Sequence, residues 1–153
     1  MTHWSDLTVR ASGLPDPVER PEFYRGTLAK RALAWVVDIV LITLFTFVAG
    51  ILTLSVAWFL WPVTFLVIGL LYRLATLASG SATWGMRLMG IELRDHSGAR
   101  FDGMSAALHV GGYYASMSFV VPQLVSIGAM LVTPRRQGLT DLVLGSAAIN
   151  RPG

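Results

Sequence analysis

The stretch that decides the fold is residues 32–54, which read ALAWVVDIVLITLFTFVAGILTL and hold a single charge, Asp38. About 20 apolar residues in an α-helix cross the hydrocarbon core of a bilayer. Residues 56–78 form a second run of this kind, with Arg73 as its single charge. Only a short uncharged connection separates the two runs. We therefore predict an antiparallel pair of transmembrane helices, at about residues 31–54 and 56–78.

The composition agrees with a membrane protein. Hydrophobic residues make up 54% of the 153 residues and charged residues 14%, whereas a soluble domain carries about 25% charge. The chain has no cysteine, which excludes a disulfide framework and any cysteine-based zinc or redox site. The net charge of +3 suits either nucleic acid or a membrane surface. The charges flank the apolar runs, so we expect the lipid bilayer as partner and no nucleic acid.

Lysine and arginine predict the orientation, because they stay on the cytoplasmic side of a membrane. Lys30 and Arg31 precede the first run, and three arginines follow the second within residues 79–103, while the connection has none. We expect a cell (inner) membrane protein whose N-terminus and residues 79–103 are cytoplasmic. Residues 1–24 are polar and proline-rich, which is typical of a cytoplasmic tail preceding a membrane domain at residues 25–150.

Residues 104–133 have two interpretations. They form one kinked helix that crosses once, or two helices, at about 104–121 and 123–133, broken at Pro122. Proline lacks a backbone donor and commonly breaks a helix. The two-helix interpretation returns the following arginines to the cytoplasm, with a last helix that is short or re-entrant.

The predicted fold is thus an all-α membrane protein, a bundle of four helical segments. A small cytoplasmic cap comes from residues 79–103 and 134–153. Within the cap, residues 91–94 alternate apolar and polar, which favours a short strand. Residues 142–149 are apolar and suit a strand or an interfacial segment.

Two charges inside the apolar runs demand partners, because a charge in the membrane interior is costly. Arg31 and Asp38 are seven residues apart and share one helix face. Arg73 lies at nearly the depth of Asp38 in an antiparallel pair, so we predict an Asp38–Arg73 contact. The sequence leaves three interpretations open: a structural pair, an ion- or proton-binding carboxylate facing a wet cavity, or a protonated Asp38 without a special role.

Two further motifs follow the apolar runs. Residues 83–90 read TWGMRLMG, and residues 136–146 read RQGLTDLVLGS. Together with Arg31 and Asp38, these motifs resemble the RDD family of prokaryotic integral membrane proteins, in which they take the forms TxGxRxxG and RQGLxDxxxGT. The family is named for the residues that stand here as Arg31, Asp38 and Asp141.

The sequence departs from the family pattern at three places. Ser146 replaces a threonine and Thr140 replaces a frequent histidine. The third helical region lacks the arginine and aspartate of many members and has His109 instead. The resemblance implies an all-helical inner-membrane protein with no cofactor and no established catalytic residue, and transport of an unidentified ligand has been suggested for the family.

The candidate site residues fall into two groups. The candidate charge network, which binds an ion or ligand or is structural, comprises Arg31, Asp38, Arg73 and Asp141. The cytoplasmic motif residues are Thr83, Gly85, Arg87, Gly90, Arg136, Gly138 and Gly145. We expect Asp141 to pair with Arg31 or Arg87 as a structural tie.

Other patterns in the sequence give less information about function. The three histidines lie far apart in the sequence, so we expect no metal site. We find no nucleophile elbow or paired catalytic carboxylates and expect no enzyme. Ala107, Gly111 and Ala115 recur every four residues, a spacing that lets helices approach closely, either within the chain or in a homodimer.

Two functions remain open from the sequence. The first is a transporter or ion-coupled permease component that uses Asp38 as its buried carboxylate, built as a homo-oligomer because one chain has few helices. The second is a non-transporting accessory or assembly protein of a larger membrane complex, whose charges are structural.

Overall fold

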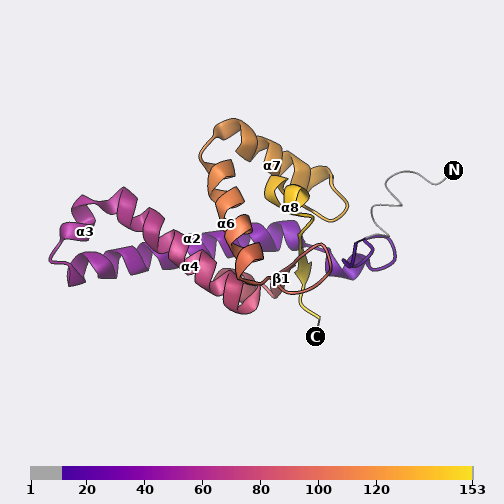
Figure 1. Cartoon of the computed structure of the whole chain (residues 1–153), viewed down its shortest axis with the longest axis horizontal. Coiled ribbons are helices and arrows are strands. Elements are labelled where there is room, and N and C mark those ends of the chain that lie inside the picture. Colours follow the sequence, from indigo (N-terminus) through magenta and orange to yellow (C-terminus); the bar gives the residue numbers. More distant parts are fainter. Residues whose placement is uncertain (1–11, 153) are drawn as a thin grey trace.

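The computed structural model describes residues 12–152 and is mostly helical (Figure 1). Residues 1–11 of the predicted tail lie outside this range. The elements in chain order are η1 (Pro21–Phe23), α2 (Thr27–Leu52), α3 (Val56–Phe59), α4 (Trp61–Gly80), α5 (Trp84–Leu88), β1 (Ile91–Arg94), α6 (Gly103–Met117), α7 (Val120–Val132), α8 (Leu139–Leu144) and β2 (Ala147–Asn150).

The long hairpin of α2 and α4 is the part best suited to cross a membrane. Both helices are long and apolar enough to span. The turn between them contains Leu54 and Ser55 in left-handed conformation. A break at Leu60 separates α3 from α4, with Pro62 in the first turn of α4, where its missing N–H is unneeded. The second predicted span is therefore a short helix followed by a long one.

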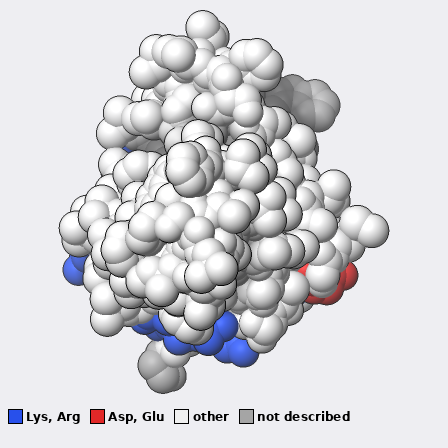
Figure 2. Space-filling view, turned by 90° about the vertical axis from the view of Figure 1, so that its left-hand side faces the viewer, with Lys and Arg blue, Asp and Glu red and all other residues white. Residues whose placement is uncertain are grey.

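The surface of this hairpin is apolar. Exposed side chains along it include Val40, Leu44, Phe47 and Leu66. Figure 2, which views the molecule from the α3 end, shows a white, uncharged face with blue and red atoms only near its margins. A soluble protein rarely exposes so large an apolar surface. The hairpin is thus built to face lipid, and the protein is a membrane protein.

Helices α6 and α7 form a sharply bent pair. The bend is 117°, and the pair could count as a third, broken span or as a re-entrant loop. The break lies at Ser118 and Phe119, just before the predicted position Pro122. Pro122 instead occupies the first turn of α7, a position that tolerates proline. With 15 and 13 residues, each helix is shorter than the roughly 20 residues of a full crossing.

The polar end of the molecule contains a small two-stranded sheet within the predicted cap. Strand β1 pairs antiparallel with β2, with Ile91 opposite Asn150 and Arg94 opposite Ala147. The predicted strand at residues 91–94 is confirmed. The apolar segment 142–149 is divided, since α8 ends at Leu144 and β2 begins at Ala147.

The described part of the tail packs against this sheet. Leu14 and Tyr24 are buried in a cluster with Ala147 and Ile149. Burial raises the pKa of Tyr24 to about 12, and its hydroxyl donates to the carbonyl of Pro15 at 2.8 Å. Residues 12–24 are therefore an ordered part of the cap.

Candidate functional site

Asp38 is buried at the junction of three helices. Its carboxylate accepts hydrogen bonds from the Tyr72 hydroxyl at 2.7 Å, the Thr83 hydroxyl at 2.7 Å and the Gly85 amide at 2.9 Å. The predicted contact with Arg73 is present, with Nη1 3.7 Å from Oδ2. Asp38 thus ties α2 to α4 and α5, and three donors besides Arg73 occupy its oxygens.

The TWGMRLMG motif explains how α5 reaches Asp38. Thr83 is the N-cap of α5: its hydroxyl accepts from the Met86 amide at 3.2 Å and donates its proton to Asp38. A Cβ added to Gly85 would lie 2.2 Å from the carbonyl oxygen of Ala34. Only glycine permits this approach of α5 to α2. The motif therefore forms a docked helical turn.

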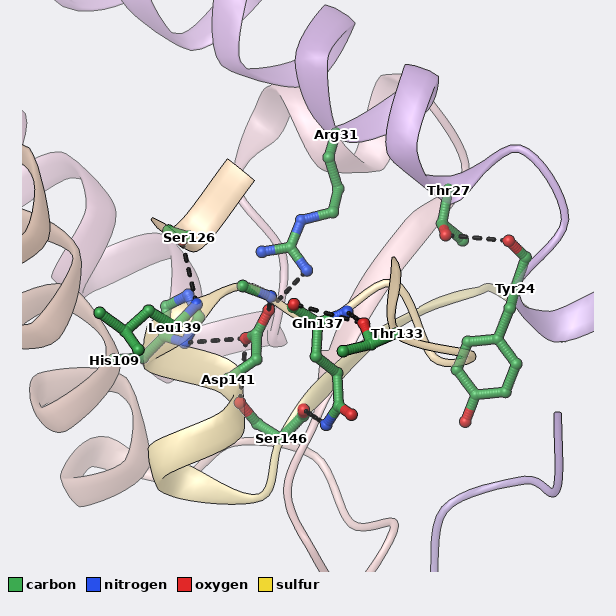
Figure 3. Close-up of polar contacts among 11 residues, drawn as sticks. Tyr24, Thr27, Arg31, His109, Ser126, Thr133, Gln137, Leu139, Asp141 and Ser146 are labelled. Carbon is green, nitrogen blue, oxygen red and sulfur yellow. Dashed lines mark hydrogen bonds and ion pairs between the residues drawn. The ribbon is translucent and has the colours of Figure 1, made fainter. Parts of the chain in front are cut away.

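Asp141 is the centre of a second buried cluster (Figure 3). Its carboxylate accepts from Arg31 Nη1 at 2.6 Å, from the Gly138 amide at 3.1 Å and from the Ser146 hydroxyl at 3.1 Å. Burial, the largest single effect, raises the pKa of Asp141, but the lowering effects together, led by the charge of Arg31, outweigh it and hold the pKa below the ordinary value.

Of the two partners predicted for Asp141, the structure has Arg31. The Arg87 side chain instead donates to the carbonyl of Ala82 at 3.2 Å. Arg31 belongs to the first turns of α2, so the pair fastens α8 to the start of the first span.

The remaining motif residues shape the backbone around these clusters. Gly90 and Gly145 have φ of +69° and +68°, a conformation that glycine adopts without strain. Gly138 is the N-cap of α8. Arg136, with φ of +53°, donates to the carbonyl of Leu131 at 2.6 Å. Gly138 also donates its amide directly to Asp141, whereas Gly90, Gly145 and Arg136 shape the backbone nearby.

His109 joins the second cluster, although the sequence analysis did not place it there. Its Nδ1 lies 3.6 Å from Oδ1 of Asp141, and its ring packs edge-on against Phe101. Nδ1 is buried and makes no hydrogen bond to the described residues. The available signal was that His109 stands in the helical region that departs from the RDD pattern.

Both clusters line one cavity of about 670 Å³. Its walls come from α2, α4, α5, α6, α7 and the α8 region. Its charged or titratable lining residues are Arg31, Asp38, Arg73, His109 and Asp141. The structure thus brings the whole predicted charge network to one chamber, whereas the sequence predicted only pairwise contacts.

Arg73 is the unusual member of the lining. The residue is 8% exposed, and its Nε and Nη2 are buried without a hydrogen-bond partner among residues 12–152. The guanidinium lies over the ring of Tyr113, 4.5 Å from the centroid, and interacts electrostatically with Tyr114. A buried donor without an acceptor is costly, so this arginine is a candidate ligand-binding group.

A third charged cluster lies in the cap, around buried Glu92. Arg94 donates to it from the same strand, and Arg100 and Arg151 lie 3.5 and 3.3 Å from its Oε2. Three arginines surround this carboxylate, which fits a structural role. Within residues 12–152, no group of three His, Cys, Asp or Glu side chains is placed to hold a metal ion.

Comparison with known proteins gives one match. No curated protein and no solved structure matches the chain. The model of the RDD family matches residues 25–145, a range that contains α2 to α8 and every member of the charge network. The chain therefore belongs to the RDD family.

Proposed function

We propose that this protein is a transporter or permease component that binds its solute in the cavity between α2, α6 and α7. The observation that carries the proposal is the lining of that cavity by Arg31, Arg73 and two buried carboxylates. Charged residues within membrane-spanning segments are costly and commonly mark a pathway. The volume of about 670 Å³ lies within the range of about 300–1,000 Å³ typical of small-molecule sites.

In this proposal the carboxylates are fixed counter-charges. Asp38 and Asp141 each accept three hydrogen bonds from the chain, so neither oxygen pair is open to a passing cation. This argues against Asp38 as an ion carrier and assigns solute contact to Arg73, whose Nε and Nη2 have no hydrogen-bond partner among residues 12–152.

The proposed topology places the protein in the cell (inner) membrane, with its N-terminus and C-terminus on the cytoplasmic side. Strand β1 precedes α6 and β2 follows α7, and the two strands pair. This pairing favours a bent α6–α7 unit that enters and leaves on one side. Two full spans are few for a pathway, so we propose a homo-oligomer or a partner membrane protein.

The test is flux of labelled anions into proteoliposomes containing the full chain, with Na⁺, K⁺ and H⁺ gradients imposed in turn as driving forces. Ile127 lines the cavity and Leu124, one turn earlier on α7, does not; both are exposed. We expect flux in the wild type and in Leu124→Trp, and its loss in Ile127→Trp, because the indole blocks the chamber. Flux that is equal in both variants would contradict the assignment of the cavity.

The alternative is a non-transporting accessory or assembly protein. The observation in its favour is the same saturation of Asp38 and Asp141, since a network satisfied within the chain needs no solute. Absence of flux under every gradient, from folded wild-type protein, would support this alternative, and co-purification from the native membrane would then identify the complex.

A further inference from the structure

We propose that the cavity binds an anionic amphiphile, with a carboxylate or phosphate head at Arg73 and an alkyl chain along the apolar walls. This inference names the ligand class and rests on the proposed function. Three observations support it: the polar side chains of the lining have more free donors than free acceptors among the described residues, the rest of the lining is apolar, and the cavity opens between α2 and α7.

The polar wall has spare donors and few spare acceptors. Nε and Nη2 of Arg73 have no partner among the described residues, while the oxygens of Asp38 and Asp141 are occupied. The Gln123 side chain, which also lines the cavity, has its oxygen occupied by the Ser116 hydroxyl at 3.0 Å. A ligand rich in acceptors complements such a wall, and a guanidinium binds carboxylate and phosphate oxygens best.

The rest of the lining is apolar. Leu28, Val36, Leu77, Val110 and Met130 are among the side chains that face the cavity. A small hydrophilic anion would leave these walls without contact, whereas an alkyl chain would pack against them along its length. A free metal cation fits neither the apolar walls nor the occupied carboxylates. The combination favours one molecule with both an anionic end and an apolar end.

The mouth of the cavity opens beside lipid. Trp35 on α2 and Ile127 on α7 line the cavity and are themselves exposed. Trp35 also donates to the Tyr113 hydroxyl at 2.8 Å. Its indole therefore lies next to the Tyr113 ring, over which the Arg73 guanidinium is positioned. An amphiphile dissolved in the bilayer can therefore enter sideways between α2 and α7, without crossing water.

The test uses Trp35 as the reporter. The full chain in phosphatidylcholine nanodiscs is titrated with chain-brominated dodecanoate, whose bromine quenches indole fluorescence on contact. We expect a saturable quenching component above the linear background from probe dissolved in lipid. Trp35→Phe should abolish the saturable component and keep the background. Dodecyl phosphate, inorganic phosphate and dodecyl maltoside are then added as competitors.

The competitors identify the ligand chemistry. Displacement by dodecyl phosphate as well as unbrominated dodecanoate supports an anionic head in general, and displacement by dodecanoate alone narrows it to a carboxylate. Equal displacement by dodecyl maltoside would overturn the anionic head, and equal displacement by inorganic phosphate would overturn the need for a chain. Absence of saturable quenching overturns the proposal.

Variants test the role of Arg73. Arg73→Gln should weaken binding at least about tenfold, because a charge-assisted hydrogen bond is lost, and Arg73→Lys should restore part of it. Arg87→Gln, which removes an arginine outside the cavity lining, should bind as the wild type does. If Arg73→Gln does not fold, Ile127→Phe against Leu124→Phe still tests whether the probe binds in the chamber, without adding a second indole to its lining.

The binding and flux experiments fail independently. Saturable binding without flux would support the ligand class while contradicting transport. Flux that Ile127→Trp abolishes, without saturable binding, would support transport and overturn the amphiphile.

Discussion

The guanidinium of Arg31 donates to the carboxylate of Asp141 at 2.6 Å, across 110 residues of chain. This pair joins the first turns of α2 to α8 and fixes one end of the cavity. Gly138 and Ser146, from the same closing motif, complete the shell around Asp141. The closing motif, residues 136–146, therefore fastens α8 to the first span, and we call this contact the lock.

Asp141→Asn should strongly destabilise the protein. The substitution leaves Arg31, whose side chain is 13% exposed, beside a neutral amide, and breaking a buried ion pair costs about 3–5 kcal/mol. Unfolding of the purified protein in nanodiscs, followed by circular dichroism, measures the loss. Asp102→Asn is the matched control: Asp102 caps α6 from an exposed position, and asparagine caps as well as aspartate. Equal losses in the two variants would contradict the lock.

The stability that Asp141 provides should depend on pH. Its folded-state pKa lies below the ordinary value of 3.8, because the raising by burial is exceeded by the lowering effects together, of which the charge of Arg31 is the largest. The unfolded chain then binds a proton first as pH falls, so the advantage of wild type over Asp141→Asn is full above 3.8 and declines below it. Unfolding midpoints of both proteins across that range measure the effect. An advantage that instead grew on acidification would reverse the sign and contradict the assigned charge state.

Gly85→Ala should disrupt the docking of α5 on α2. The new Cβ would meet the backbone carbonyl of Ala34 at 2.2 Å, and overpacking of this kind costs about 1–3 kcal/mol. Gly111→Ala is the control, because a Cβ there meets nothing within 4 Å and alanine favours a helix by about 1 kcal/mol. In thermal unfolding, Gly85→Ala should lower the midpoint temperature and Gly111→Ala should raise it. A Gly85→Ala protein as stable as wild type would show that α5 moves freely.

Much of the hairpin could be predicted from the sequence, because its signals are local. The apolar runs predicted two spans, and matching depths in an antiparallel pair predicted the Asp38–Arg73 contact. Helix ends were less accurate. We predicted that the first helix begins at about residue 31, because the charged residues Lys30 and Arg31 mark the start of the apolar run. The structure extends α2 to Thr27, after Gly26 with φ of +69°.

The cavity could not be predicted, because it depends on how distant elements pack. His109 lies beside Asp141 because α6 packs against α8, and no residue pattern specifies that packing. The small-residue stripe shows the same limit. Gly112 packs against Thr140, whereas a Cβ at Gly111 would meet open space, so neighbouring glycines have different surroundings.

Thr83→Val should weaken the junction at Asp38 more than Thr83→Ser. The Thr83 hydroxyl donates to Asp38 at 2.7 Å and accepts from the Met86 amide at 3.2 Å. Valine has nearly the same shape but removes both bonds, at a cost of about 1–3 kcal/mol. Serine keeps the hydroxyl and loses only a methyl group. Unfolding free energies of the three proteins in nanodiscs compare the two contributions. A serine variant that falls as far as the valine variant would assign the role of Thr83 to methyl packing, and Asp38 would then depend on Tyr72, Gly85 and Arg73 alone.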